Sequence, residues 1–507
     1  MHKDFKRAKR LALSFSFMAA LSSVAWAQSV SKIADQTAQY AVKTYQQDAI
    51  NSLAKLVSFN TVAKEGTPST ENPVHIAFKN ELKKQALSLG LDYQDKGYLV
   101  IIGLGNSGER VGIITHGDIQ PVNPAKWQKS PFELDMTSKP GKLIGRGTED
   151  DKGPISTALY AMKAIRDKQI QLNKRIELYV YMAEESDWEP LKEYVKNNEL
   201  PQTNITIDAE YPVVTAEKGY GTVKMTFPSN QDIDTSSPYI SSFSGGFFRS
   251  QIPEDAKAVI ENVSAKLYQQ IKAKALTHKG MRYDYQWQGK QLTITALGKS
   301  AHSSKPSDGV NAISHLADVL SNRSWPNNAA GALVNFINDN LGTDLYGRKF
   351  GNIAYQDDFM GPMTVAPTVL TKNQQGIELS INLRRPKGKS TEQLEDEITQ
   401  ATTRWQQQNQ INLLDLDNDI GDPFVLTDAL HIGTLLSVFS HYTGIKDAKA
   451  IAIGGGTNSR LFPNAVSFGP SMPNTEYTGH SEHEFITMEQ FILNLKMYTA
   501  VMIELAH

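Results

Sequence analysis

The stretch RIELYVYMAEES, residues 175–186, decides the fold class that this sequence predicts. Every second residue at its start is apolar, which is typical of a β-strand with one face against a core: Ile176, Leu178, Val180 and Met182. Two adjacent carboxylates, Glu184 and Glu185, follow the strand. Adjacent glutamates usually belong to a solvated loop, so their meaning depends on how the other strands of the chain end.

Three further polar clusters stand where predicted elements begin or end. The strand 111–115 leads into His116, and the strand 204–207 leads into Asp208. Asp150 lies in GRGTEDDKGP, whose proline is well placed in the first turn of a helix. Strand–helix alternation predicts an α/β fold with a largely parallel sheet flanked by helices, and ligands of such folds gather outside the carboxyl ends of the strands. We therefore expect these side chains to meet in one crevice.

The residue types in this crevice predict a divalent metal site. Imidazole and carboxylate groups are suitable ligands, and because the chain has no cysteine, thiolate ligands and a cysteine nucleophile are excluded. The number of carboxylates favours two ions, since a bridging carboxylate can hold a metal pair about 3.5–4 Å apart.

Length and composition limit the remaining function classes. With 507 residues the chain is too long for one core, so two or more domains are expected. Apolar residues make up 40% and charged residues 21%, as in ordinary globular proteins. A net charge of −2 gives no reason to expect nucleic acid or an anionic membrane as partner, and a small-molecule substrate fits better.

The N-terminus has the pattern of a signal peptide, residues 1–27. Five basic residues precede an apolar run from Leu11 to about Val24, and Ala25-Trp26-Ala27 matches a cleavage site. The run is short for a membrane-spanning helix, although an uncleaved membrane anchor is the alternative. We expect an exported protein, periplasmic or secreted, with no membrane contact after cleavage.

Two glycine-rich segments call for different interpretations. GLGNSG, residues 103–108, matches a dinucleotide-binding string, but a strand rather than a helix follows, so we predict a hairpin turn. IAIGGGTNSR, residues 451–460, lacks the lysine of a phosphate loop and predicts close backbone approach to a small ligand. Downstream, GHSEHEF contains His480 and His483, and either could bind a metal.

Eight strings in this order resemble the co-catalytic zinc metallopeptidases, the family that includes aminoacylase, acetylornithine deacetylase, carnosinase and carboxypeptidase G. They are similar above all to its peptidase V-type dipeptidases. The strings are THGDIQP, GRGTEDDKGP, AEES, DAEYP, GKSAHSSKP, INLRRP, GGGTNSR and GHSEHEF. They cover nearly the whole chain after residue 27, so the resemblance is specific.

The resemblance implies a role for each candidate residue. One metal would be held by His116 and Asp208 and the other by Glu185 and His480, with Asp150 bridging both. Glu184 would be the general base. Asp118 would accept the second N–H of His116, and the Asp150–Asp151 peptide would be cis.

A lid domain is the second structural implication. The predicted organisation is a signal peptide (1–27), a first catalytic segment (28–218), an inserted α+β lid (219–386) and a second catalytic segment (387–507). The lid would supply His302 as oxyanion donor and Arg384 as clamp for the substrate carboxylate, although Arg385 could exchange roles with it. Further predicted substrate contacts are Gly455, Gly456 and Arg460.

The predicted function is hydrolysis of dipeptides by a metallopeptidase with two divalent ions, zinc first, with cobalt or manganese as substitutes. The alternatives within the family are an N-acyl amino acid deacylase and a metallocarboxypeptidase. A solute-binding or structural protein that has lost catalysis would lack the base or the bridging carboxylate, and neither is missing. The resemblance also implies a monomer, since relatives with a smaller lid use a partner subunit's histidine, and a dimer is the alternative.

Overall fold

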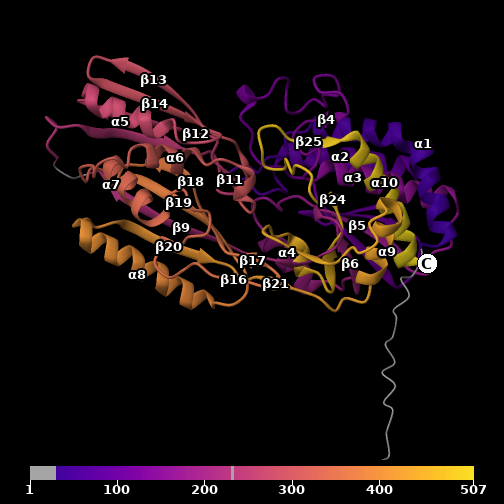
Figure 1. Ribbon diagram of the computed structural model, residues 1–507. Helices are drawn as coiled ribbons and strands as arrows, with labels where there is room; N and C mark the ends of the chain where they lie inside the picture. Colours follow the sequence, from indigo (N-terminus) through magenta and orange to yellow (C-terminus); the bar gives the residue numbers. More distant parts are fainter. Residues whose placement is uncertain (1–29, 230–232) are drawn as a thin grey trace, which may run out of the picture.

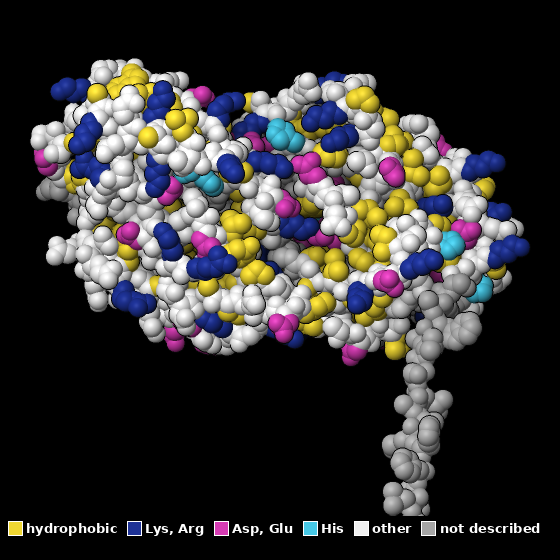
Figure 2. Space-filling model, in the orientation of Figure 1, with side chains coloured by type: hydrophobic (Ala, Val, Ile, Leu, Met, Phe, Trp, Pro, Cys, Tyr) yellow, Lys and Arg dark blue, Asp and Glu magenta, His cyan; other side chains and the backbone are white. Residues whose placement is uncertain are grey.

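The computed structural model describes residues 30–229 and 233–507 and shows two units side by side (Figure 1). The predicted signal peptide lies outside the described residues. Among the helices in these two ranges, none has the length and apolar character needed to cross a membrane. Basic and acidic side chains are interspersed on the visible face of both units, in keeping with the small net charge (Figure 2).

The larger unit contains a nine-stranded sheet whose central strands β5, β3, β6 and β23 are parallel and whose edges are antiparallel. The expected α/β sheet is therefore confirmed. In order across the sheet, its strands are β1 (Asp92–Asp95), β2 (Leu99–Leu104), β5 (Arg175–Tyr181), β3 (Arg110–His116), β6 (Thr203–Thr206), β23 (Ala465–Ser467), β8 (Val214–Glu217) and β21 (Phe424–Val425), with β22 (Ile451–Ile453) also paired to β8.

The predicted hairpin at residues 103–108 is wrong. Strands β2 and β3 do not pair with each other, because β5 lies between them and pairs with both. The glycine-rich segment is therefore a loop that crosses the end of β5. Pairing of a strand with a partner about 65 residues away depends on tertiary packing, which a local turn pattern does not encode.

Alternation along β5 places its side chains in two separate cores. Leu178 and its apolar partners on one face join the main cluster with helices α1 (Lys32–Val57), α3 (Lys152–Asp167) and α10 (Met488–Ala506). Tyr179 and Tyr181 point to the other face, near α4 (Glu189–Asn197). Helices α2 (Pro73–Ser88) and α9 (Ile432–Thr443) complete the main cluster. Both faces of the sheet are covered, so a ligand can reach the sheet at the ends of its strands.

The smaller unit is an α+β domain with two four-stranded antiparallel sheets and one core. One sheet has the order β10 (Tyr239–Gly245), β12 (Asp255–Glu261), β14 (Gln291–Leu297), β13 (Arg282–Gln288). The other has the order β18 (Thr364–Lys372), β19 (Gly376–Arg385), β9 (Gly219–Pro228), β20 (Leu414–Ile420). Its helices are α5 (Ala265–Ala275), α6 (Ala312–Val319), α7 (Ala329–Phe336) and α8 (Thr391–Asn409). We call this unit the lid.

The lid extends beyond the predicted boundary at residue 386. Strand β20 pairs with β9, and Leu394, Ile398 and Trp405 of α8 lie in the lid core. Residues 391–420 therefore belong to the lid, and we correct its end to about Gly421. The sequence pattern missed this because an amphipathic helix buries its apolar face equally well against either sheet.

Short two-stranded ribbons connect loops around the site. They are β7 (Ala209–Glu210) with β24 (Pro470–Ser471), β4 (Lys142–Ile144) with β25 (Phe485–Thr487), β11 (Gln251–Ile252) with β15 (Ala301–His302), and β16 (Gln356–Asp357) with β17 (Gly361–Pro362).

Candidate active site

The predicted metal ligands come from five separate elements and meet at the carboxyl ends of the central strands. His116 ends β3, Glu185 follows β5, and Asp208 follows β6. Asp150 stands just before α3, and His480 lies in the loop between β24 and β25. Parallel neighbours end at the same edge of a sheet, so burial of the strands brings their polar ends together.

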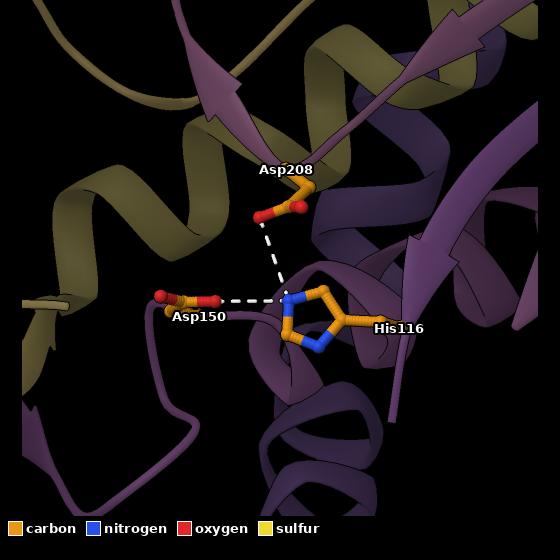
Figure 3. Close-up of side chains that lie close together, drawn as sticks. All are labelled: His116, Asp150 and Asp208. Atoms are coloured by element: carbon orange, nitrogen blue, oxygen red, sulfur yellow. Dashed lines mark hydrogen bonds and ion pairs between the residues drawn. The ribbon is translucent and has the colours of Figure 1, made fainter. Parts of the chain in front are cut away.

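Asp150 is shared by two clusters of possible ligand atoms, each within 4.8 Å. In the first, His116 Nε2 lies 2.9 Å from Asp150 Oδ1 and 3.5 Å from Asp208 Oδ1 (Figure 3). In the second, His480 Nε2 lies 3.0 Å from Glu185 Oε1 and 3.2 Å from Asp150 Oδ2. The two oxygens of Asp150 thus face different histidines, which is the geometry of a bridging ligand.

The charge of this site fits two divalent ions. Asp150, Glu184, Glu185 and Asp208 lie close together, and among the described residues their only ion-pair partners are the two histidines. Burial raises the pKa of Asp208 to about 6, and the nearby carboxylates add to this effect. Buried anions need paired cations, and two divalent ions would balance the four negative charges. Oxygen and imidazole donors suit zinc and similar metals.

Asp118 contacts His116 and the two glutamates through both its backbone and its side chain. Its carbonyl oxygen lies 3.1 Å from His116 Nδ1, while its carboxylate oxygen is 3.5 Å away. The carboxylate accepts the backbone N–H groups of Glu184 and Glu185, each at 3.0 Å. The sequence predicted only the contact with His116. Asp118 in addition fixes the turn that carries both glutamates.

Glu184 is held by Asn458, the residue that follows the glycine-rich loop 454–457. The backbone N–H of Asn458 donates to Glu184 Oε1 at 3.2 Å, a contact that the sequence did not reveal. Burial raises the pKa of Glu184, and the charge of Asp208 raises it further. Its neighbour Glu185 accepts from Gln120 Nε2 at 2.6 Å and faces His480. The two adjacent glutamates therefore have distinct surroundings.

The loop before α3 is fixed by Glu484. Its buried carboxylate accepts the backbone N–H groups of Gly147, Glu149 and Asp150 and a hydrogen bond from Arg146. The Asp150–Asp151 peptide is cis, as the resemblance implies. The hydroxyl of Tyr477 donates to Asp150 Oδ2 at 3.0 Å. The sequence analysis did not name Tyr477 as a site residue, although its position three residues before His480 indicated that it lies near the site.

His302 enters the site from the lid, where it is partly buried. The backbone N–H of Ser304 donates to His302 Nδ1 at 3.1 Å, which leaves the proton of the neutral ring on Nε2. Burial lowers the pKa of His302 well below its usual value, and the charges of His480 and Arg384 act in the same direction. His302 is thus a neutral N–H donor, with its ring centroid 4.4 Å from that of His480.

The structure separates Arg384 from Arg385, because successive residues of β19 point to opposite faces. Arg385 is paired with Asp422 and bonded to two backbone carbonyls, away from the site. Among the described residues, Arg384 donates to Asn382 and to the Oγ of Ser303, the residue after His302, and it stacks over Tyr220. Within the described residues no carboxylate lies within ion-pair distance of Arg384. Burial lowers its pKa to about 10.

A cleft of about 1020 Å³ between the units is lined by Arg384 and Glu184 and by two of the three remaining predicted substrate contacts. Gly456 and Arg460 line this cleft, and Gly455 lines a connected pocket of about 90 Å³ beside Asp150 and Asp208. Gly454 is the residue that needs to be glycine here, since a Cβ would lie 2.5 Å from the carbonyl oxygen of Ser304. His483 is exposed and lines a different pocket, so His480 alone joins the cluster.

Two histidine–carboxylate clusters that share one aspartate, at the strand ends of an α/β sheet, define a co-catalytic metallohydrolase. The chain belongs to peptidase family M20/M25/M40, whose model matches residues 112–504. It is 28% identical over 408 residues to the Beta-Ala-Xaa dipeptidase of Lactobacillus delbrueckii subsp. lactis, covering 80% of this chain and 83% of that protein.

Solved structures share the fold over nearly the whole chain. Human carnosine dipeptidase 1 matches with a TM-score of 0.58 and 13% identity, covering 94% of this chain and 99% of that one. The dipeptidase Dug1p from Saccharomyces cerevisiae matches with a TM-score of 0.57 and 12% identity, covering 92% and 98%. The arrangement of sheet and lid is therefore that of known members of this fold.

Proposed function

We propose that this protein hydrolyses the peptide bond of free dipeptides with two divalent metal ions, zinc first. His116 and Asp208 would hold one ion, Glu185 and His480 the other, and Asp150 both. When bound, such ions polarise the scissile carbonyl and lower the pKa of water. The name of the Lactobacillus relative, a dipeptidase, supports this substrate class.

Glu184 moves the proton in this proposal. Its carboxylate takes a proton from the attacking water as the oxygen adds to the carbonyl carbon, and it then delivers that proton to the leaving amine. The N–H of Asn458 holds one oxygen of Glu184, so the other is free to face the water. The raised pKa favours the protonated form that the second step needs.

His302 stabilises the charge that develops on the carbonyl oxygen. Because its Nδ1 accepts from Ser304, its Nε2–H is available to donate to that oxygen. A neutral ring keeps this donor in place over the working pH range. The donor comes from the lid of the same chain, so one chain contains every proposed catalytic group.

The observation that favours free dipeptides is Arg384, which is buried beside the oxyanion donor and has no carboxylate among the described residues as its partner. Arg384 and His302 line the same cleft, and the charge of Arg384 lowers the pKa of His302, so a substrate carboxylate held by Arg384 would lie close to the oxyanion donor. On the other side, the pocket of about 90 Å³ is lined by Glu210, Lys305 and Tyr477. A pocket this small favours a short segment of substrate before the scissile bond.

The two alternative activities make different demands on the carboxylate end and the inner end of the substrate pocket. An N-acyl amino acid deacylase needs an apolar acyl pocket, and a metallocarboxypeptidase needs space for a longer chain. The Glu210–Lys305 ion pair at 2.6 Å places two charges in the lining of the inner pocket, which an apolar acyl group does not need. Turnover of free dipeptides, N-acetylated dipeptides and tripeptides measured side by side separates the three activities.

The proposal is tested with purified protein. A chelator should abolish dipeptide hydrolysis and added zinc should restore it. Glu184→Gln should retain two metals per chain, measured by elemental analysis, and lose turnover by at least about 100-fold. Substantial turnover in this variant would show that another group is the base.

Export and oligomeric state are further parts of the proposal. The residues 1–27 support export to the periplasm or medium, which N-terminal sequencing of protein from each cell fraction tests. The presence of His302 in its own chain's pocket supports a monomer. Light scattering coupled to gel filtration measures its mass directly.

A further inference from the structure

The backbone of His480 adopts a conformation that its neighbours must hold in place. Its φ angle is +64°, in the left-handed region that residues other than glycine seldom occupy. The side chain is almost fully buried, with 7% of its surface exposed. Two hydrogen bonds hold this residue from the lid: Gln251 Nε2 donates to the His480 carbonyl oxygen at 2.9 Å, and Ser250 Oγ lies 3.1 Å from Nδ1.

The two ring nitrogens of His480 have different partners. Nε2 faces Glu185 and Asp150 and is the atom positioned for a metal. A histidine that binds metal through Nε2 carries its proton on Nδ1 and needs an acceptor there, which the hydroxyl of Ser250 provides. The ring of Phe248, from the same lid segment, meets the imidazole edge-on at 6.1 Å.

His116 has no such dependence on the lid. Its Nδ1 is 3.1 Å from the carbonyl oxygen of Asp118, which belongs to the larger unit, as do Asp150 and Asp208. One of the two histidines is therefore oriented by its own unit and the other across the interface. A change in the position of the lid therefore acts directly on His480 and not on His116.

The lid segment at Ser250 is joined to the oxyanion donor. Gln251 pairs with His302 in the ribbon of β11 and β15, and the backbone N–H of Ser303 donates to the carbonyl oxygen of Ser250 at 2.8 Å. A single ribbon thus places His302 in the pocket and completes the hydrogen bonds of His480. Closure of the lid would assemble both at once.

We infer that Ser250 and Gln251 are positioning residues for the metal held by His480, so that retention of this ion depends on the closed lid. The inference rests on the proposed role of His480 as a ligand. By linkage, the ion must stabilise the closed lid to the same extent as closure strengthens its binding. The other ion, at His116 and Asp208, should bind with either lid position.

The test is titration of metal-free protein with Zn²⁺ against a competing chromophoric chelator, which resolves two binding steps. Ser250→Ala, Gln251→Ala and the double variant should weaken one step by about 10–100-fold and leave the other unchanged. Ser250→Thr keeps the hydroxyl and should restore binding in the single variant. A matched control is Lys299→Ala, which removes an exposed pair with Glu476 across the same interface without touching His480.

The outcomes separate this inference from the proposed function. The inference is overturned if both metal-binding steps are unchanged in the double variant, or if both are weakened equally. It is also overturned if Lys299→Ala weakens metal binding as much as the double variant does. If the wild-type chain binds no metal at all, the proposed function fails with it. Loss of one step only, rescued by threonine, supports the coupling of lid and metal.

Discussion

Replacement of Arg384 by methionine tests the proposed grip on the substrate carboxylate. Arg384 is 4% exposed. Its guanidinium has no carboxylate within the described residues at ion-pair distance, and it has donors left over after its bonds to Asn382 and Ser303. A substrate carboxylate would be buried against it. Removing one partner of a buried ion pair costs about 3–5 kcal/mol, because the other charge remains uncompensated.

This energy corresponds to a loss of roughly 10²–10⁴-fold in kcat/KM for a free dipeptide. The assay compares each dipeptide with its C-terminal amide, in the wild type and in Arg384→Met. The wild type should prefer the free acid, and the variant should lose that preference because the amide never used the guanidinium. Equal losses for acid and amide would refute the carboxylate clamp.

Arg385→Gln provides the matched control on the same strand. Arg385 points to the other face, where it is paired with Asp422 and bonded to the carbonyl oxygens of Gly421 and Lys389. Its replacement should lower the melting temperature while preserving the preference for the free acid. A change of preference in this variant would mean that the two arginines have been assigned the wrong way round.

Three further predictions concern Glu217, which is buried beneath Thr457 of the glycine-rich loop, and two residues of the site. Burial raises the pKa of Glu217 from 4.5 to about 7. Its contribution to stability is therefore full below pH 4.5, and about 3 kcal/mol of it is lost as the pH rises to 7. The melting temperature of Glu217→Gln, relative to that of the wild type, should rise over this pH range, and a difference between the two that does not change with pH would contradict this. His302→Ala should lower kcat by about 10²–10³-fold with both metals retained, as measured by kinetics and elemental analysis. Asp118→Asn loses an acceptor for the N–H groups of Glu184 and Glu185. The affinity of this variant for metal, measured by competition with a chelator, should fall by about 10–100-fold. Wild-type affinity would show that the turn keeps its conformation without the carboxylate.

The sequence by itself determined the chemistry of this protein. Strand patterns ending in His116, Glu185 and Asp208 were readable because alternation and strand ends are local properties, and the parallel sheet then required these ends to meet. The types and spacing of the metal-binding candidates were therefore available before any contact was known. The α/β class followed from the same alternation.

Only the tertiary structure decided how the units divide the chain and which neighbours hold the reactive groups. The placement of β5 between β2 and β3 and of α8 on the lid results from long-range packing, for which a local pattern has more than one solution. The same holds for Asn458 beside Glu184 and Ser250 beside His480, which meet across about 230–270 residues of chain. Hydrogen bonds between such distant segments leave no periodic trace in the sequence, since each partner is an ordinary loop residue until the fold brings them together.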